Sequence, residues 1–138
     1  MPDWTHQLAA DEVKVGDELP AITIPVTLQR LVMEASANYD LSLMHHDKRA
    51  AESVGAGDAF ANTFFLMGMY ERLLREWAGT AMRIKRIGDM RMLSFNQVDD
   101  VVTFSGKVRE IDGDLVTIDM QSSVGEQLTS SAFSIVTL

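Results

Sequence analysis

The chain has 138 residues, no cysteine and a formal net charge of −8. Its length suffices for one hydrophobic core, so we expect residues 1–138 to form a single domain. The lack of cysteine excludes disulfides, thiolate metal sites and a cysteine nucleophile, and the acidic balance argues against nucleic-acid binding. No stretch is apolar enough to cross a bilayer, and the N-terminus lacks the pattern of a secretory signal. We therefore expect a cytoplasmic protein that binds neither nucleic acid nor membrane.

The first regular elements are a short strand and a helix. Residues 21–26 are rich in β-forming residues, and Pro25 among them favours an edge strand or a bulge. Thr27 is a suitable N-cap, and apolar and small side chains recur with helical spacing over residues 28–36. This pattern predicts a helix that ends near Tyr39.

A polar segment with the sequence YDLSLMHHD follows at residues 39–47. Asp40 stands five residues before His45, which is too far for one strand face and out of phase for one helix face, so the segment must turn. A turn brings the carboxylate and the imidazole to one point, where they can act as a general acid/base pair on a shared water near neutral pH. The alternative interpretation is a solvated loop, because short Asp/His patterns are common.

A long apolar helix is predicted next. Asp47 is placed to cap one or two helical turns over residues 47–54. Residues 59–70 are apolar nearly all round, and we expect a helix that runs from there to Trp77, buried on all sides and closed by Gly79. Core packing explains most of its methionine and phenylalanine residues better than a ligand pocket does.

Strands make up the rest of the chain. Hydrophobicity alternates over residues 80–95, 101–111, 115–123 and 127–138. The Asp112-Gly113 step predicts a hairpin turn, and alternation of this kind is typical of antiparallel strands. Strands that follow helices indicate the α+β class. We expect an antiparallel sheet wrapped around the long helix, and dimerisation through sheet edges or faces, because so small a sheet cannot hide its own edges.

Two aspartates and one histidine carry a resemblance to a known family. The motif of MaoC-like dehydratases of the hydratase-2 type resembles the arrangement of Asp40, His45 and Asp47 in this chain. These residues follow a short helix and precede a long apolar helix and a run of strands, as in that family. The resemblance covers residues 11–138 and implies an α+β single hotdog fold. It implies a lyase that reversibly hydrates a 2-enoyl-CoA thioester to the 3-hydroxyacyl-CoA. Asp40 and His45 would be the catalytic residues, with no metal and no cofactor other than the coenzyme A of the substrate.

Two places depart from the family's motif. The usual Asn and Pro after the catalytic Asp are replaced by Ser42 and Leu43. The usual His-Gly at the start of the buried helix aligns with Asn62-Thr63. In the family the Gly backbone N–H forms the oxyanion hole. The resemblance therefore implies that Ser42, Asn62 and Thr63 position the substrate, and it leaves the true oxyanion-hole residue open.

A local basic stretch is the candidate site for coenzyme A phosphates. Half of the twelve Lys and Arg residues lie within residues 72–91. A solvated helix end and strand face explains this stretch equally well. The resemblance to a CoA-dependent family favours Arg83, Lys85 and Arg86 as phosphate-binding residues.

Four short motifs narrow the resemblance: HHD at 45–47, WAG at 77–79, IKRIG at 84–88 and VTFSG at 102–106. They are similar to the small single-hotdog subunit of actinobacterial heteromeric enoyl-CoA hydratases, which act in steroid side-chain degradation. In that group the Asp/His pair lies on the small subunit, and the partner is a second MaoC-like chain. The resemblance thus implies a homodimer or a heteromer and a bulky, steroid-type acyl group. The sequence leaves open the acyl group, the choice between homo- and hetero-oligomer, and which member of the pair is the base.

Two other functions remain as alternatives. Hotdog folds also host acyl-CoA thioesterases, which usually activate water with one acidic residue on the long helix, and Asp58 lies near the expected start of that helix. The third hypothesis is a non-catalytic hotdog subunit that completes a partner's acyl-CoA site, and the departures from the motif support it. The Asp40/His45 pair favours hydration over both.

Overall fold

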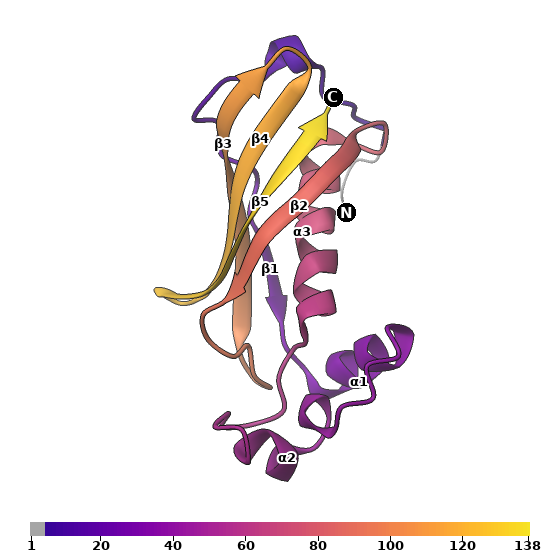
Figure 1. Ribbon diagram of the computed structural model, residues 1–138, viewed down its shortest axis with the longest axis vertical. Helices are drawn as coiled ribbons and strands as arrows, with labels where there is room; N and C mark the ends of the chain where they lie inside the picture. The colour runs from indigo at the N-terminus through magenta and orange to yellow at the C-terminus, as the bar shows by residue number, and fades with distance from the viewer. Residues whose placement is uncertain (1–4) are drawn as a thin grey trace.

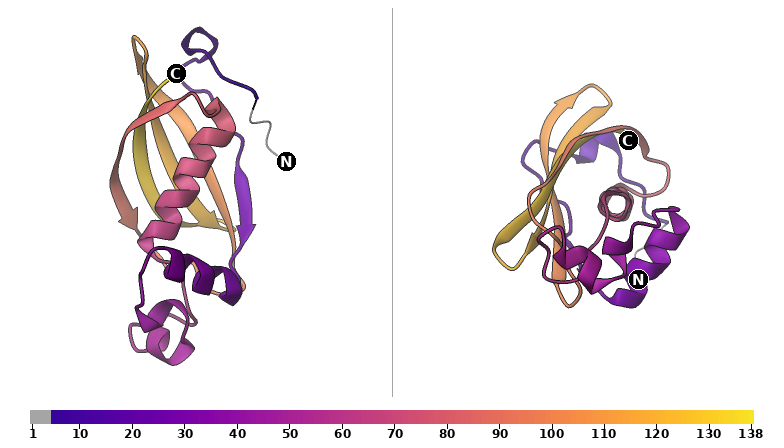
Figure 2. Two further views of the ribbon diagram at one scale, coloured as in Figure 1. Left: turned by 90° about the vertical axis from the view of Figure 1, so that its right-hand side faces the viewer. Right: turned by 60° about the horizontal axis from the view of Figure 1, so that its bottom comes forward.

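The computed structural model describes residues 5–138 and contains one five-stranded sheet and three α-helices (Figure 1). In chain order the elements are η1 (Ala10–Glu12), β1 (Ile22–Pro25), α1 (Leu28–Ala37), η2 (Leu43–His45), α2 (Lys48–Glu52), α3 (Thr63–Ala78), β2 (Arg83–Met92), β3 (Val101–Asp112), β4 (Leu115–Val124) and β5 (Gln127–Thr137). The strands pair antiparallel in the order β1-β3-β4-β5-β2. The sheet curves around α3 (Figure 2), so the expected α+β hotdog architecture is confirmed.

The short first strand lies at one edge of the sheet, as predicted. Among the described strands β1 pairs only with β3, with Ile22 opposite Phe104 and Pro25 opposite Val101. A proline has no N–H to donate to a second neighbour, so an edge position costs it no ladder hydrogen bond. Ile22 and Ile24 are buried while Thr23 and Pro25 are exposed, which is the alternation of a half-buried strand.

The core lies between the concave face of the sheet and α3. On the helix, Leu66, Leu73 and Leu74 are fully buried. The inward side chains of the two central strands pack against them: Val102, Phe104 and Val108 on β3, and Val116, Ile118 and Met120 on β4. Each buried side chain of this size stabilises the fold by about 1.5–3 kcal/mol relative to its exposed state. This packing fixes α3 in place along its length.

A small polar network inside this core joins α3 to the sheet. The hydroxyl of Tyr70 lies 2.7 Å from the hydroxyl of Ser130, and Ser122 lies 2.8 Å from Thr129 and 2.5 Å from Ser130. All four residues are buried. Burial raises the pKa of Tyr70, so its hydroxyl keeps its proton for this network. A fully bonded buried network of this kind specifies one packing of helix against sheet.

The long helix differs from the prediction in two ways. It begins at Thr63 rather than near residue 59, because residues 59–61 are extended and bond to the loop before β3 (Ala61 N–H to Asn96 O, 2.9 Å). An apolar run does not distinguish buried extended chain from helix. The helix is also not buried on all sides: Phe64 is 56% and Met67 38% exposed. The sheet and α1 leave this face of α3 uncovered within residues 5–138.

The segment between β1 and α3 forms a separate cap at one end of the molecule. α1, η2 and α2 lie beyond the N-terminal end of α3 (Figures 1 and 2). Both predicted N-caps are confirmed: Thr27 accepts from the Arg30 N–H at 3.1 Å, and Asp47 from the Ala50 N–H at 3.0 Å. None of the helices within residues 5–138 has the length and apolar character needed to cross a bilayer.

The end of α3 depends on a glycine that no other residue can replace without strain. Gly79 has φ 91° and ψ −178°, a region that is essentially restricted to glycine. A Cβ there would lie 2.3 Å from the carbonyl oxygen of His6 and 2.5 Å from Oε1 of Gln7. The helix end and the N-terminal segment therefore fit together only when residue 79 has no side chain.

We predict that Gly79→Ala lowers the free energy of unfolding by about 3 kcal/mol or more, from backbone strain and these two clashes. Gly113→Ala is the matched control, because Gly113 has φ 61° and no atom within 4 Å of its added Cβ. The control should lower the free energy of unfolding by only about 1 kcal/mol. Urea unfolding of both variants measures the difference, and equal losses would contradict this description of the helix end.

Candidate active site

Asp40 reaches the site because α1 ends in a left-handed turn. Tyr39 has φ 56°, which is uncommon for a residue with a side chain. The Asp40 N–H then bonds back to the carbonyl oxygen of Ala35 at 2.9 Å. The chain reverses at this point, as the spacing predicted, and turns the carboxylate of Asp40 toward the first residues of α3. Strained backbone beside a polar residue is a frequent feature of functional sites.

His45 is held in one tautomer by a backbone carbonyl. It is the last residue of η2, and its side chain is 8% exposed. Nδ1 lies 2.8 Å from the carbonyl oxygen of Phe60, and the Phe60 ring packs edge-on at 5.2 Å. A carbonyl oxygen only accepts, so Nδ1 carries the proton. Neutral His45 therefore presents its lone pair at Nε2.

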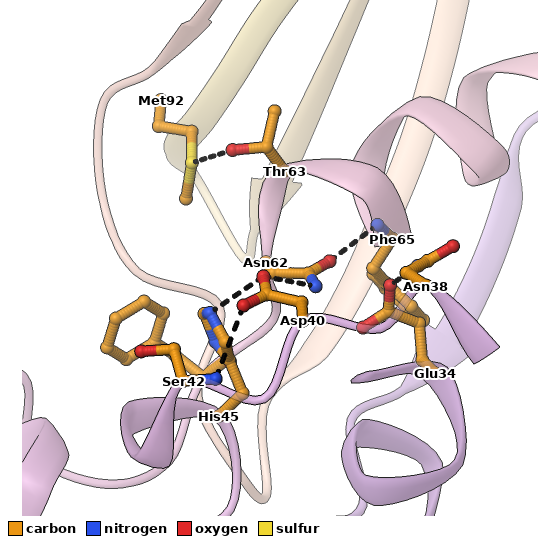
Figure 3. Close-up of polar contacts among 10 residues, drawn as sticks. Glu34, Asn38, Asp40, Ser42, His45, Asn62, Thr63, Phe65 and Met92 are labelled. Atoms are coloured by element: carbon orange, nitrogen blue, oxygen red, sulfur yellow. Dashed lines mark hydrogen bonds and ion pairs between the residues drawn. The ribbon is translucent and has the colours of Figure 1, made fainter. Parts of the chain in front are cut away.

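The two predicted residues meet at that nitrogen (Figure 3). Nε2 of His45 lies 3.3 Å from Oδ2 of Asp40, whose side chain is 26% exposed. An unprotonated Nε2 and a carboxylate are both acceptors, so they attract only when one proton lies between them or when a water donates to both. The arrangement is therefore suited to hold a water and to exchange its protons.

Asn62 orients Asp40 and caps α3 at the same time. Its Oδ1 accepts the N–H of Phe65 at 2.8 Å, and its Nδ2 donates to Oδ2 of Asp40 at 2.8 Å (Figure 3). The cap determines which end of the amide is oxygen, so the donor must face the carboxylate. Asn62 is buried, and its position depends on the helix that it caps.

Ser42 and Thr63 lie beside the pair. Ser42 contacts Asp40 through its backbone N–H, 3.4 Å from Oδ1. Thr63 is the first residue of α3, and its hydroxyl lies 3.3 Å from Sδ of Met92. The N–H groups of a first helical turn have no partner within the helix, and that of Phe65 is taken by Asn62. The N–H groups of Thr63 and Phe64 are therefore the donors that this helix end offers.

The predicted phosphate-binding residues lie at the other end of β2. The strand runs from Arg83 to Met92, and Met92 contacts Thr63 beside the site. Arg86 is roughly 20 Å from Met92 along the strand at the usual rise per residue. The structure does not bring Arg83, Lys85 and Arg86 next to the Asp/His pair, and their role stays a prediction.

Asp58 does not lie where the thioesterase alternative needs it. It precedes α3, and the first turn of that helix contains no acidic residue. The N–H of Ala59 and the ammonium of Lys48, 3.1 Å away, bond to this carboxylate and lower its pKa. Asp58 thus has structural partners of its own, which weakens that alternative.

Two parts of the site escaped the sequence analysis. The carbonyl of Phe60 orients His45, and no side-chain motif signals a backbone acceptor. Glu34 on α1 is the other. Burial raises its pKa, and the amide of Asn38 and the nearby His45 offset part of that rise. It stands six residues before Asp40 in the sequence, a spacing that carries no recognisable pattern.

Comparison with known proteins and solved structures shows which of them resemble this chain in sequence and in fold. No protein-family model matches the chain. The beta subunit of 3-oxo-4,17-pregnadiene-20-carboxyl-CoA hydratase of Mycobacterium tuberculosis is 31% identical over 119 residues, which are 85% of this chain and 92% of that subunit. A chain of the ChsH1-ChsH2 complex of the same organism is 29% identical, with a TM-score of 0.86 over 91% of this chain and 98% of that one. The (R)-hydratase of A. caviae involved in PHA biosynthesis shares the fold, with a TM-score of 0.86 at 16% identity over 94% of this chain and 99% of that one.

We predict that Asn62→Asp destabilises the protein in a pH-dependent way. The variant keeps an oxygen to cap α3 but replaces the donor to Asp40 with a second carboxylate. The lost charge-assisted hydrogen bond should lower the free energy of unfolding by about 1.5–3 kcal/mol near neutral pH. Two adjacent carboxylates raise one folded-state pKa above its unfolded value. The penalty is therefore present above that pKa and shrinks as the pH falls through it.

Urea unfolding near neutral and mildly acidic pH measures this effect. Asn62→Ala is the control, because it removes the cap and the donor but adds no charge. Its loss of free energy of unfolding should depend less on pH than the loss in Asn62→Asp. If Asn62→Asp loses the same free energy of unfolding at both pH values, Asp40 and Asn62 do not interact as described.

Proposed function

The chain belongs to the family of this hydratase beta subunit, the MaoC-like hydratases with the hotdog fold, and on that premise we propose that it reversibly hydrates a 2-enoyl-CoA thioester to the 3-hydroxyacyl-CoA. The observation that carries the proposal is the contact between Nε2 of His45 and Oδ2 of Asp40 at 3.3 Å. The relative's name gives its substrate as a pregnadiene carboxyl-CoA. We propose a bulky, steroid-type acyl group for this chain as well, and a cytoplasmic location, where CoA thioesters are metabolised.

In the proposed reaction the pair exchanges protons with one water. The water oxygen bonds to Cβ of the enoyl group, one of its protons passes to the Asp40/His45 pair, and the pair returns a proton to Cα. The pair ends with the protons it began with, so we treat it as one unit and assign the base to neither residue alone. Hydration leaves the substrate's overall oxidation level unchanged, and the atoms balance without an oxidant or reductant.

The thioester oxygen gains negative charge as Cβ is attacked, and the start of α3 is the proposed site that stabilises it. The N–H groups of Thr63 and Phe64 and the positive end of the helix dipole favour such a charge. Asn62 is committed to Asp40 and to the cap, so we propose that it positions the pair instead of contacting the oxyanion. Ser42 holds the carboxylate of Asp40 through its backbone N–H.

We propose that a second hotdog chain completes the substrate site. Apolar side chains from the elements around the site are exposed: Tyr39, Leu41, Leu43, Phe64, Met67, Met92 and Leu93. An apolar surface of this kind beside a polar site is typical of an interaction surface. The outer edge of β2 also has no strand partner within residues 5–138. The relative is named as one subunit of a hydratase, which favours a heteromer with a second MaoC-like chain over a homodimer.

We predict that Asp40→Asn and His45→Ala each lower kcat for enoyl-CoA hydration by about 100-fold to 10,000-fold, because each removes half of a general acid/base pair. The double variant should be little worse than either single one, since residues that act as a unit are not additive. Loss of the enoyl-thioester absorbance measures the rate, with the chain alone and with its partner chain.

His46→Ala is the matched control, since His46 is the neighbouring imidazole and makes no hydrogen bond or ion pair with Asp40 within residues 5–138. It should keep nearly full activity. Wild-type rates in Asp40→Asn would contradict the proposed roles. Release of free CoA from a saturated acyl-CoA would instead support the thioesterase alternative.

We also predict that Phe64→Glu combined with Met67→Glu weakens association with the second hotdog chain, because two charges would be buried in the interface. The dissociation constant should rise by about 30-fold or more. Val15→Glu is the control, because Val15 is an exposed apolar residue in the loop that bonds to β3 through Gly16. Sedimentation of the chain alone and of the co-expressed pair measures association, and unchanged association of the double variant would place the interface elsewhere.

A further inference from the structure

A glycine in the middle of α3 has no local explanation. Gly68 lies on the exposed side of the helix, and its φ is not in the left-handed region that favours glycine. Apart from its two neighbours and the helix's own backbone, no heavy atom of residues 5–138 lies within 4 Å of the Cβ that another residue would add. Alanine is the better helix former at such a position. The open space above Gly68 is therefore available to something outside the chain.

The surface around Gly68 is apolar only near the start of α3. Phe64, one turn earlier, and Met67, the preceding residue, are exposed on the same side of the helix. Further along this side, Glu71 and Arg75 form an ion pair at 2.8 Å. The apolar part thus runs from Phe64 to Gly68, roughly 6 Å along the helix axis. A patch of this length, bounded by charges, matches a small apolar group better than a whole protein interface.

The proposed site for the thioester oxygen lies one turn away from Gly68. The donors proposed for this oxygen are the N–H groups of Thr63 and Phe64, and Gly68 is roughly 6–8 Å further along the axis. The acyl group and the pantetheine arm of coenzyme A leave the thioester in opposite directions. The pantetheine arm contains amides that need hydrogen-bond partners, whereas the side chains of Phe64 and Met67 offer no donor and no strong acceptor. This side of α3 therefore suits the acyl group.

We propose that Gly68 determines the size of the acyl group that the site accepts, because the missing side chain lets a rigid fused-ring group lie directly against the backbone of α3. This inference rests on the proposed hydratase function and names the residue that makes room for a bulky substrate. A short acyl group ends before it reaches Gly68. A fused-ring group cannot bend around an added side chain, so it would have to move away from the Asp40/His45 pair. Phe64 and Met67 then border both the acyl group and the second chain.

The test compares the wild type with Gly68→Ala and Gly68→Leu, each in the complex with the co-expressed partner chain. One substrate is crotonyl-CoA, which has a short acyl group, and the other is a 2-enoyl-CoA with a fused-ring acyl group. We expect kcat/KM for the fused-ring substrate to fall about tenfold in Gly68→Ala and about 100-fold or more in Gly68→Leu. In both variants kcat/KM for crotonyl-CoA should stay within about twofold of the wild-type value, because this substrate does not reach the added side chain.

A cavity of about 580 Å³ between α1 and α3 is another place where a bulky group would fit. Ile24, Phe65 and Met69 line it, and so does the exposed Gln29. Gln29→Trp is the matched control, because an indole there obstructs this cavity and leaves the surface above Gly68 open. It should change the rate with neither substrate. If Gln29→Trp rather than Gly68→Leu selectively lowers the rate with the fused-ring substrate, the acyl group lies in the cavity and the proposal is wrong.

Two further outcomes would overturn the proposal. Equal losses with both substrates in an intact complex would place the pantetheine arm, which both substrates share, above Gly68. Equal losses with dissociation of the complex, observed by sedimentation, would place the second chain there.

Gly68→Ala keeps the test decisive if Gly68→Leu does not fold. It should raise the urea midpoint of the chain alone by a few tenths of a molar, because alanine favours the helix and its Cβ meets no other atom. A lower midpoint would show that the space above Gly68 is not open, which would contradict the premise of the proposal.

The proposed function and the role of Gly68 can fail separately. Saturated acyl-CoAs cannot be hydrated, so their dissociation constants, measured by calorimetry, test Gly68 without turnover. Weaker binding of a saturated fused-ring acyl-CoA in Gly68→Leu, with unchanged binding of butyryl-CoA, would support the role of Gly68 even if no 2-enoyl-CoA is hydrated. Hydration by the wild type with the same substrate preference in both variants would leave the function standing and refute the role of Gly68.

Discussion

The hydrogen bond between Nδ1 of His45 and the carbonyl oxygen of Phe60 is the interaction on which the site depends. It determines which nitrogen of the imidazole faces Asp40, and so whether the pair can share a water or a proton. Phe60 can offer its carbonyl because residues 59–61 are extended and bonded to the loop before β3. If α3 began four residues earlier, as its apolar sequence suggests, that carbonyl would be used inside the helix. The late start of α3 therefore leaves the Phe60 carbonyl free to orient His45.

The rest of the structure holds the two halves of the site in place. The core packs α3 against the sheet, and the buried network around Tyr70 joins it to β4 and β5. Asn62 transfers this fixed position to Asp40, because its amide caps α3 with one end and binds the carboxylate with the other. The loop that carries His45 is held by its own turn bonds and by Phe60. A loop placed against the start of a rigid helix in this way can keep a catalytic geometry without being part of the core.

Features determined by nearby residues could be predicted from the sequence. The caps at Thr27 and Asp47, the edge position of β1 with Pro25, the hairpin at Asp112-Gly113 and the turn that joins Asp40 to His45 all follow from local chemistry, and the structure has them. Features determined by distant contacts could not. The Phe60 carbonyl has no side-chain signal, and the burial that raises the pKa of Glu34 depends on tertiary packing. The proposed coenzyme A site and the proposed acyl group would depend on tertiary packing and on a second chain, so the sequence of one chain does not determine them.

The most direct test of this account is the tautomer of His45, observed by ¹⁵N NMR of the free protein at a pH where the imidazole is neutral. We expect a protonated Nδ1 and a bare Nε2, because the Phe60 carbonyl can only accept a hydrogen bond. The Nδ1 resonance should show a directly attached proton and the Nε2 resonance the shift of an unprotonated nitrogen. A proton on Nε2 with a bare Nδ1 would contradict the account, since the pair could not then take a proton from water through that nitrogen.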